Sequence, residues 1–197
     1  DELLHKFCIF FKFQSDDEGD KLIEREKQNY LNIDNLFIPK YYGYGETFGN
    51  NFIVFEYING HNLNDIKKLK LSKSDKISII YELIIVFQYI HNKGFIYRDL
   101  KPDNVIIDKN KTAVLIDFDR LISNPTDFTQ ITVNFAHKYY APEIVLGSFT
   151  NSCDIYSLGL IIYYLMTEKE PNSQDSSKIL MDFPSEFAEA AEAKLQI

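Results

Sequence analysis

Short aromatic and β-branched runs dominate the first third of the chain, and this pattern is typical of strands. We expect these strands at residues 5–13, 37–45 and 50–58. An acidic turn at 14–20 precedes residues 21–33, where apolar side chains recur between charges and predict a helix. The glycines of GYGETFG (43–49) predict a β-turn between the second and third strands.

Two later segments have the pattern of helices. The clearest covers residues 71–94, where Ser74 is suited to cap the start and Gly94 to end the helix. Residues 153–167 are almost wholly apolar after Asp154, which predicts a helix buried on all sides. No apolar run is long enough to span a bilayer, so we expect no membrane partner.

Between these helices, the β-type runs 104–108 and 112–117 are joined by a short polar segment, which predicts a hairpin. Strands, a helix, strands and then mostly helices indicate an α+β fold. We expect a small β-rich unit over residues 1–57, a connection at 58–60 and a larger helical unit over 61–197. A cleft between two such units is a common place for a ligand.

Composition narrows the class of protein. With 45% hydrophobic and 15% aromatic residues, the chain is globular rather than disordered. Its net charge of −8 argues against a nucleic-acid partner. Cys8 and Cys153 lie far apart without metal-type spacing, which indicates reduced thiols in a cytoplasmic protein.

Candidate chemistry appears in IYRDLKPDNVIID (96–108), between a predicted helix and a predicted strand. A loop at this junction is expected to direct Asp99, Lys101 and Asn104 towards one point. An aspartate accepts a proton from a hydroxyl, and a lysine neutralises a transferring phosphoryl group. An asparagine supplies an oxygen ligand to Mg²⁺.

Four motifs then point to one family. YRDLKPDN (97–104) resembles the catalytic loop of the eukaryotic protein kinases, H-R-D-x-x-x-x-N, with Tyr97 in place of histidine. DFD (117–119) falls where the D-F-G metal motif belongs, and APE (141–143) matches A-P-E. DIYSLG (154–159) is similar to the family's D-x-W-S-x-G helix start. The order and spacing identify the chain as a member of this family, which implies a protein-kinase-like two-lobe fold.

The resemblance implies roles at the matching positions. Asp99 orients the substrate hydroxyl and Lys101 stabilises the transferring charge. Asn104 and Asp117 hold Mg²⁺, and Lys12 positions the phosphates of ATP.

Lys12 should in turn pair with a glutamate on the next helix. Counting back from IPKYYG (38–43) favours Glu26, with Glu24 as the alternative. Residues two positions apart do not share a helix face, so only one of them can pair with the lysine.

The resemblance also implies a hinge that binds adenine. Phe55 narrows the back of the nucleotide pocket, while Glu56, Ile58 and Ile106 contact the nucleotide. His91 lies before the catalytic loop and is expected to be a packed structural histidine rather than a base.

Departures from the family pattern raise specific expectations. Phe10 shares a strand face with Lys12 where the family has alanine, so its ring is expected to crowd adenine. Asp119 replaces a glycine and is expected to adopt left-handed backbone angles at a cost of about 1 kcal/mol. Its charge either adds a ligand near Mg²⁺ or repels the phosphates. Ala136 removes a hydroxyl that normally bonds the catalytic residues, whereas Tyr97 is expected mainly to pack against Phe118.

Two further expectations concern regulation and extent. Arg98 is suited to bind a phosphorylated residue of the following segment, Thr129 or Thr132 before Thr126. The phosphate-covering loop and the last helices of the family are not recognisable, so we expect a fragment of a longer protein that is inactive or very weak alone.

The main hypothesis is a serine/threonine protein kinase domain that uses ATP and Mg²⁺ on a protein substrate, since Lys101 after Asp99 is typical of that class. The alternative is a pseudokinase that binds partners without phosphotransfer, which Phe10, Asp119 and Ala136 favour. A small-molecule phosphotransferase fits less well, because such proteins lack A-P-E. Nothing in the sequence indicates an oligomeric state.

Overall fold

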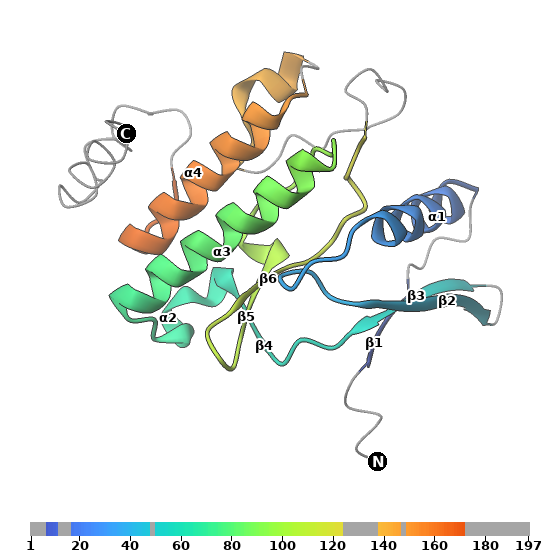
Figure 1. Ribbon diagram of the computed structural model, residues 1–197, viewed down its shortest axis with the longest axis horizontal. Coiled ribbons are helices and arrows are strands. Elements are labelled where there is room, and N and C mark those ends of the chain that lie inside the picture. The colour runs from blue at the N-terminus through green and yellow to red at the C-terminus, as the bar shows by residue number, and fades with distance from the viewer. Residues whose placement is uncertain (1–6, 12–16, 48–49, 124–137, 147–148, 172–197) are drawn as a thin grey trace.

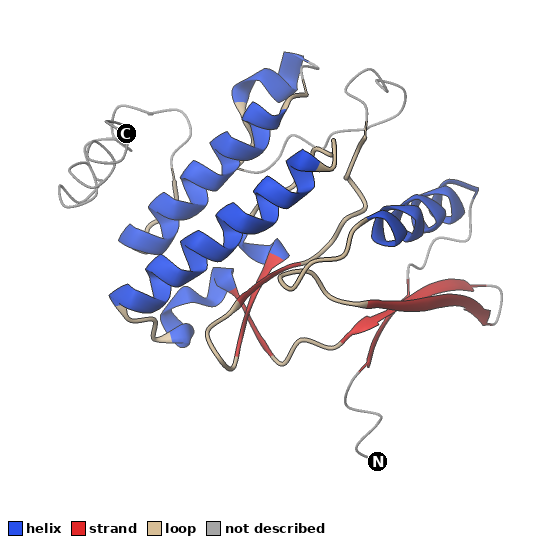
Figure 2. Cartoon of the chain, viewed as in Figure 1, coloured by secondary structure: helices blue, strands red, loops and turns tan. Residues whose placement is uncertain are grey.

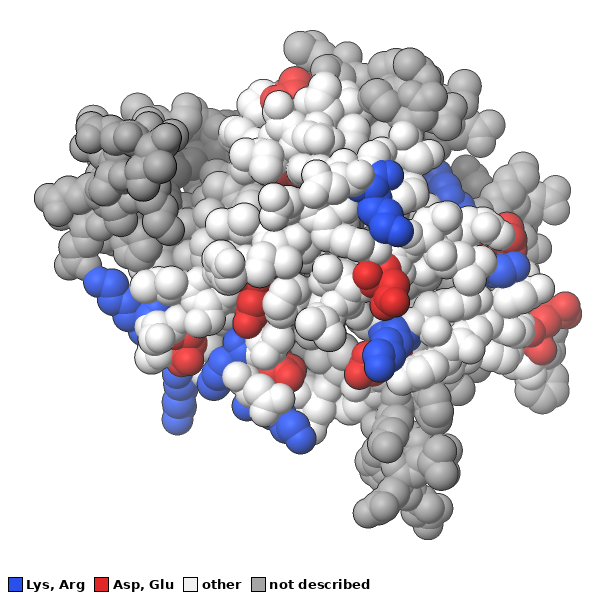
Figure 3. Space-filling view, viewed as in Figure 1, with Lys and Arg blue, Asp and Glu red and all other residues white. Residues whose placement is uncertain are grey.

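The computed structural model describes residues 7–11, 17–47, 50–123, 138–146 and 149–171. In these residues, a three-stranded sheet with helix α1 beside it forms one end of the molecule, and α3 and α4 lie side by side at the other (Figure 1). Figure 2 shows that the strands of a second small sheet lie between them. The arrangement confirms the predicted α+β fold. On the face shown in Figure 3, the described Lys and Arg side chains are interspersed with Asp and Glu.

The first sheet is antiparallel and its strand order is β1-β3-β2. Its strands are β1 (Phe7–Phe11), β2 (Tyr41–Thr47) and β3 (Asn50–Glu56). Helix α1 (Asp17–Asn32) packs on this sheet through Tyr30, whose ring centroid lies 4.3 Å from that of Phe55 on the central strand. The sheet and α1 therefore share one apolar layer.

The predicted β-turn at 43–49 is wrong over residues 43–47, because β2 continues through Thr47. Gly43 lies at an irregularity in the pairing with β3, at a φ of 154° that glycine adopts without steric cost. Gly45 lies opposite Phe52, and a Cβ added there would be 2.6 Å from the aromatic ring. The two glycines thus suit a strand, one at a bulge and one beneath a ring.

Two element starts also differ from the predictions. Helix α1 begins at Asp17 rather than at residue 21, because the sequence at 17–20 carries acids that the helix dipole favours in a first turn. Strand β2 begins at Tyr41 rather than at 37, because Asn35 engages the preceding backbone. Its Oδ1 accepts the N–H of Phe37 at 3.0 Å, and its carbonyl accepts the N–H of Ile38 at 3.1 Å.

Helix α3 (Lys73–Asn92) confirms the predicted long helix, but its cap is Ser72 rather than Ser74. The Ser72 hydroxyl accepts the backbone N–H of Asp75 at 3.1 Å, and the Asp75 carboxylate accepts the N–H of Ser72 at 2.8 Å. This reciprocal capping box satisfies two amides at once. Gly94, at a φ of 80°, follows the end of the helix as predicted.

The second sheet has the order β4-β5-β6 and confirms the predicted hairpin. Its strands are β4 (Gly60–Asn62), β5 (Val105–Asp108) and β6 (Ala113–Leu115). In the hairpin turn, Asp108 Oδ1 accepts the N–H groups of Asn110 at 2.7 Å and Thr112 at 2.9 Å. The sequence did not predict β4, which precedes a 3₁₀ turn (Leu63–Asp65) and the short helix α2 (Ile66–Leu69).

Helix α4 (Asn151–Thr167) confirms the predicted apolar helix, although it is not buried on all sides. Leu158, Ile161 and Leu165 belong to the core shared with α3, whereas Ile155 is 54% exposed. The reason is that α3 and the core contact only part of its circumference. None of the described helices is long and apolar enough to cross a membrane.

Replacing Gly60 by alanine is expected to lower the free energy of unfolding by about 2 kcal/mol or more. An added Cβ would lie 2.2 Å from the carbonyl oxygen of Ile107 in β5, so the two strands must separate. Urea denaturation measures the loss. The control is Gly159→Ala on α4. There an added Cβ would have no atom within 4 Å outside the helix's own backbone, and alanine should stabilise the helix by about 0.5–1 kcal/mol. Equal losses in both variants would contradict the steric explanation.

Candidate active site

The segment predicted to carry the chemistry folds into a compact turn. Asp99 is 2% exposed, and its Oδ2 accepts hydrogen bonds from Lys101 Nζ at 2.7 Å and Asn104 Nδ2 at 2.9 Å. Asn104 Nδ2 also donates to the Asp99 backbone carbonyl at 2.8 Å. The 3₁₀ turn over Pro102–Asn104 returns the asparagine to the aspartate, because such a turn has only three residues per revolution. The structure thus brings together the three residues that the sequence expected to converge.

Asp154, at the start of α4, supports this turn from inside the protein. It is 1% exposed, and its carboxylate accepts the backbone N–H groups of Tyr97 at 2.9 Å and Arg98 at 2.8 Å. His91 Nε2 lies 2.8 Å from Asp154 Oδ2, which confirms a structural role for this histidine. The sequence did not reveal these contacts. The available signal was an acid in the first turn of an otherwise apolar helix.

Two residues that sequence reasoning missed cover the other oxygen of Asp99. The Tyr140 hydroxyl donates to Asp99 Oδ1 at 3.0 Å, and Arg120 Nη1 lies 3.4 Å from the same atom. Arg120 also donates to the Tyr140 hydroxyl. Burial and the nearby Asp99 carboxylate raise the pKa of Tyr140 to about 12, so the phenol keeps its proton at neutral pH. Donors therefore surround both oxygens of the aspartate.

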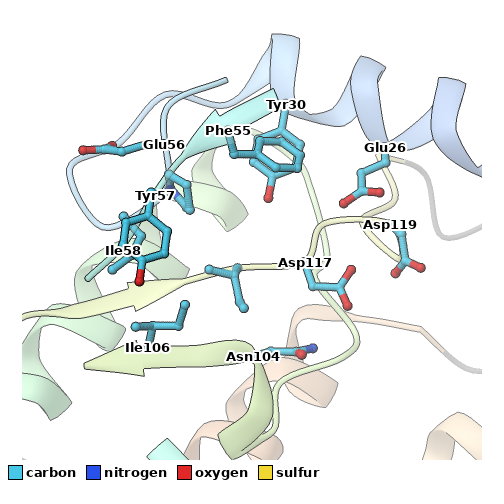
Figure 4. A pocket seen from close by; sticks show the side chains of 12 residues that line it. Glu26, Tyr30, Phe55, Glu56, Tyr57, Ile58, Asn104, Ile106, Asp117 and Asp119 are labelled. Carbon is cyan, nitrogen blue, oxygen red and sulfur yellow. The ribbon is translucent and has the colours of Figure 1, made fainter. Parts of the chain in front are cut away.

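A cavity of about 400 Å³ lies beside this cluster (Figure 4). One end is apolar and is formed by Phe55, Ile58 and Ile106. Acidic and amide side chains form the other end: Glu26, Asn104, Asp117 and Asp119. An apolar slot that ends in oxygen ligands suits a ligand with a flat apolar part and a charged part.

The residues that the resemblance assigns to the nucleotide lie around this cavity. Glu56 is the last residue of β3 and Ile58 lies two residues beyond it, while Ile106 on β5 lines the same cavity. Phe55 also lines the cavity, and its narrowing of the nucleotide pocket stays a prediction. The structure brings these positions together, and their contact with a nucleotide stays a prediction.

The two candidate glutamates of α1 have different surroundings. Glu26 is 5% exposed and lies in the cavity wall. The Glu24 side chain is 54% exposed, and it accepts hydrogen bonds from Lys27 at 3.0 Å and Gln28 at 2.9 Å. Its pKa is lowered by the hydrogen bonds from Gln28 and Lys27. Only Glu26 is therefore placed to interact with a ligand in the cavity.

Asn104 and Asp117 provide the oxygen donors that Mg²⁺ prefers. Both line the cavity, and the Ile116 N–H donates to the Asn104 carbonyl at 2.9 Å, which links the two segments. The Asn104 amide nitrogen is engaged with Asp99, so its oxygen is the atom suited to a cation. This donor set fits a magnesium ion shared with phosphates. Among the described residues, no group of three or more His, Cys, Asp or Glu is arranged to hold a metal ion.

The backbone expectation for Asp119 is wrong. Asp117, with a φ of 65°, is the residue of this motif in the left-handed region, and Asp119 does not have a positive φ. Glycine is therefore not required at position 119, and the expected cost of about 1 kcal/mol does not arise there. The Asp119 carboxylate lies in the cavity wall, at its acidic end.

Polar side chains hold the backbone that follows Asp117. Arg25 Nε donates to the Asp119 carbonyl at 3.0 Å, and Asn29 Nδ2 donates to the Phe118 carbonyl at 2.7 Å, both from α1. Arg98 Nε donates to the Arg120 carbonyl at 2.7 Å. Burial lowers the pKa of Arg98 to about 10, with smaller effects from Arg25 and Arg120. The motif at 117–119 is thus anchored both to α1 and to the segment 97–104 that contains Asp99.

Aromatic rings pack behind the motif. The Phe118 ring centroid lies 5.3 Å from that of Tyr97 and 5.1 Å from that of Tyr30. Tyr41 extends the row, 6.3 Å from Tyr30. The predicted packing of Tyr97 against Phe118 is confirmed. Helix α1, the segment 97–104 and the motif at 117–119 therefore each contribute a ring to one aromatic row.

Some predicted residues lie outside the part of the chain that the structure describes. They are Lys12, the side chain of Phe10, Ala136, Thr126, Thr129 and Thr132. The pairing of Lys12 with Glu26, the crowding of adenine by Phe10 and the phosphothreonine contact of Arg98 therefore stay predictions.

Comparison with known proteins gives a consistent result. A family profile described as "Protein kinase domain" matches residues 8–194. Serine/threonine-protein kinase D of Synechocystis sp. is 34% identical over 162 residues, covering 77% of this chain and 32% of that protein. Maternal embryonic leucine zipper kinase of Xenopus tropicalis is 31% identical over 171 residues, covering 82% of the chain and 26% of that protein. Dual specificity protein kinase zak2 of Dictyostelium discoideum is 30% identical over 177 residues, covering 85% of the chain and 27% of that protein.

The chain spans about a quarter to a third of the length of these relatives. The match nevertheless includes both the sheet with α1 and the helical part, and it covers the turn around Asp99 and the motif around Asp117. The chain therefore belongs to the protein kinase domain family.

Proposed function

We propose that the chain is the core of a protein kinase that transfers the γ-phosphoryl group of ATP to a serine or threonine hydroxyl of a protein. The observation that carries this proposal is the position of Asn104. It donates to the buried carboxylate of Asp99 and also lines the cavity that contains Asp117. A proton acceptor and two metal donors are therefore adjacent, as phosphoryl transfer requires.

Each residue then has a role in the transfer. Bound Mg·ATP supplies the phosphoryl group and a cation that neutralises phosphate charge. Asp99 orients the substrate hydroxyl and accepts its proton, while Lys101, 2.7 Å from Asp99, stabilises negative charge between them. Asn104 and Asp117 would hold the metal. Glu56, Ile58 and Ile106 would contact the base at the apolar end.

A pseudokinase remains the competing proposal, in which the same cavity serves only for binding. It rests on Phe10, Asp119 and Ala136 in the sequence. The bonding of Lys101 and Asn104 to Asp99, and the presence of Asn104 and Asp117 in the cavity wall, support the enzyme instead.

Mg·ATP is expected to raise the melting temperature of the full-length protein. At a nucleotide concentration one hundredfold above Kd, binding raises the free energy of unfolding by about 2.7 kcal/mol. This corresponds to a rise in melting temperature of about 5–10 °C. Asp117→Asn should remove the part of the shift that depends on Mg²⁺, whereas Asp103→Asn, an exposed acid in the same region, should not. The absence of any shift with millimolar nucleotide would overturn the proposed function.

The same assay separates the two glutamates of α1. Glu26→Gln is expected to reduce the Mg·ATP-dependent shift by about half or more, because this side chain lies in the cavity wall. Glu24→Gln is the matched control on the exposed face, and it should leave the shift unchanged. A larger effect of Glu24→Gln would reverse the assignment.

A further inference from the structure

The Tyr140 hydroxyl occupies the position beside Asp99 that a substrate hydroxyl would take under the proposed function. It donates to Asp99 Oδ1 at 3.0 Å, within the distance at which a general base holds the proton that it removes. The other oxygen of Asp99 accepts from Asn104 Nδ2 at 2.9 Å, and Asn104 lines the acidic end of the cavity. A single carboxylate therefore lies between a hydroxyl of the chain itself and the end of the cavity suited to phosphates.

Packing fixes the Tyr140 ring in this position. The ring belongs to a buried apolar cluster that includes Ile96, Ile144 and Phe149, and the residue is only 9% exposed. Because the side chain is so deeply buried, its hydroxyl is in contact with Asp99 of the same chain and closed to the active site of a second molecule. A transfer to this hydroxyl therefore takes place within one chain.

The charges around the hydroxyl suit a phosphoryl acceptor. Burial, and then the Asp99 carboxylate, raise the pKa of Tyr140 to about 12, so the phenol is protonated and needs a base when it reacts. Arg120 donates to the same hydroxyl, and Lys101 Nζ lies 2.7 Å from Asp99 Oδ2. Two cations thus lie beside the Asp99 carboxylate, where they would stabilise the charge of a transferring phosphoryl group.

We propose that Tyr140 is a phosphorylation site of the chain's own activity, with Asp99 as the base. In this step the Tyr140 oxygen forms a bond to the γ-phosphorus of ATP. The bond between that phosphorus and the β,γ-bridging oxygen breaks, and ADP leaves with the electron pair. Asp99 takes the phenol proton and passes it to solvent. The inference rests on the proposed function, because it uses the same nucleotide and the same aspartate.

The contact between Tyr140 and Asp99 can be measured without nucleotide. Tyr140→Phe removes only the hydroxyl, and it is expected to lower the melting temperature of the full-length protein by about 2–4 °C, the effect of one hydrogen bond. In an Asp99→Ala background the same substitution should cost less than about half of that, because the acceptor is absent. Equal losses of melting temperature in the two backgrounds would overturn the proposal.

Tyr139→Phe is the matched control for this comparison. Tyr139 is the neighbouring residue and is also buried, but its hydroxyl donates to Glu170 Oε2 at 3.3 Å. The loss in melting temperature caused by Tyr139→Phe should therefore be the same with and without the Asp99 carboxylate.

The second measurement is the phosphate that the dephosphorylated full-length protein gains during incubation with Mg·ATP. Tandem mass spectrometry should locate phosphate on Tyr140 in the unmodified protein and in Tyr139→Phe, whereas Tyr140→Phe has no acceptor at this position. Because donor and acceptor belong to one chain, the rate constant should not change when the protein is diluted about a hundredfold. A rate constant that rises with protein concentration would contradict transfer within the chain and overturn the proposal.

Casein, added as an external substrate, separates this inference from the proposed function. Phosphate on casein without phosphate on Tyr140 would overturn the inference and leave the proposed function standing. Phosphate on neither also overturns the inference, and the nucleotide-dependent rise in melting temperature then decides separately on the proposed function.

Discussion

Replacing Asp154 by alanine is expected to lower the free energy of unfolding by about 4 kcal/mol. Its carboxylate accepts the N–H groups of Tyr97 and Arg98 and contacts His91, and all of these bonds are lost together. The two amides then lie buried without an acceptor, at about 1–3 kcal/mol each. Urea denaturation followed by circular dichroism measures the change. A loss smaller than 1 kcal/mol would contradict the proposed anchoring role.

Two variants calibrate this result. Asp154→Asn keeps one acceptor oxygen but places an N–H₂ group against a second donor, so an intermediate loss is expected. Asp65→Ala removes an exposed carboxylate that pairs with Lys68 at 3.0 Å, and exposed pairs of this kind contribute less than about 1 kcal/mol. The order of losses should therefore be Asp154→Ala, Asp154→Asn and then Asp65→Ala.

Phosphotransfer is expected to fall about 10³-fold in Asp99→Asn. An amide does not accept the hydroxyl proton, and each oxygen of Asp99 now faces donors: Lys101 and Asn104 on one side, Tyr140 and Arg120 on the other. In Asp99→Asn, an N–H₂ group replaces one of the two oxygens. It then faces one of these pairs of donors and cannot accept their hydrogen bonds. Nucleotide-dependent stabilisation should be retained, because the cavity wall is formed by other residues.

Incorporation of radioactive phosphate from ATP into a protein substrate measures the fall in kcat. Asp103→Asn is the control, because this acid lies in the same turn and its side chain is exposed, where it accepts from Asn64. Activity in Asp99→Asn close to that of the unmodified protein would remove Asp99 from the proposed mechanism, even if nucleotide still binds.

Sequence reasoning located residues whose contacts are local. Asp99, Lys101 and Asn104 lie within one turn, and their convergence follows from chain geometry over a few residues. The hairpin of β5 and β6 and the two long helices were predictable for the same reason, since period and turn residues act locally.

Contacts between distant segments were not predictable in this way. Asp154 meets the amide of Tyr97 across a separation of 57 residues, and Tyr140 meets Asp99 across 41. No periodic pattern encodes such pairs, because they depend on how elements pack. The wrong turn prediction at Gly43 has a related cause. Gly43 and Gly45 allow β2 to pair closely with the neighbouring strand β3, whereas the prediction assigned both glycines to a turn.

The hydrogen-bond donors that surround both oxygens of Asp99 have a consequence for substrate selection. Under the proposed function, a substrate hydroxyl must displace the Tyr140 hydroxyl from Asp99 Oδ1, because the Asp99 carboxylate is 2% exposed and bonded to that tyrosine. Part of the energy gained by docking a substrate is then used in that exchange and does not appear as affinity. Short peptides, which make few contacts away from the reacting hydroxyl, should therefore lose turnover rate as well as affinity. Folded protein substrates with larger contact areas should retain both.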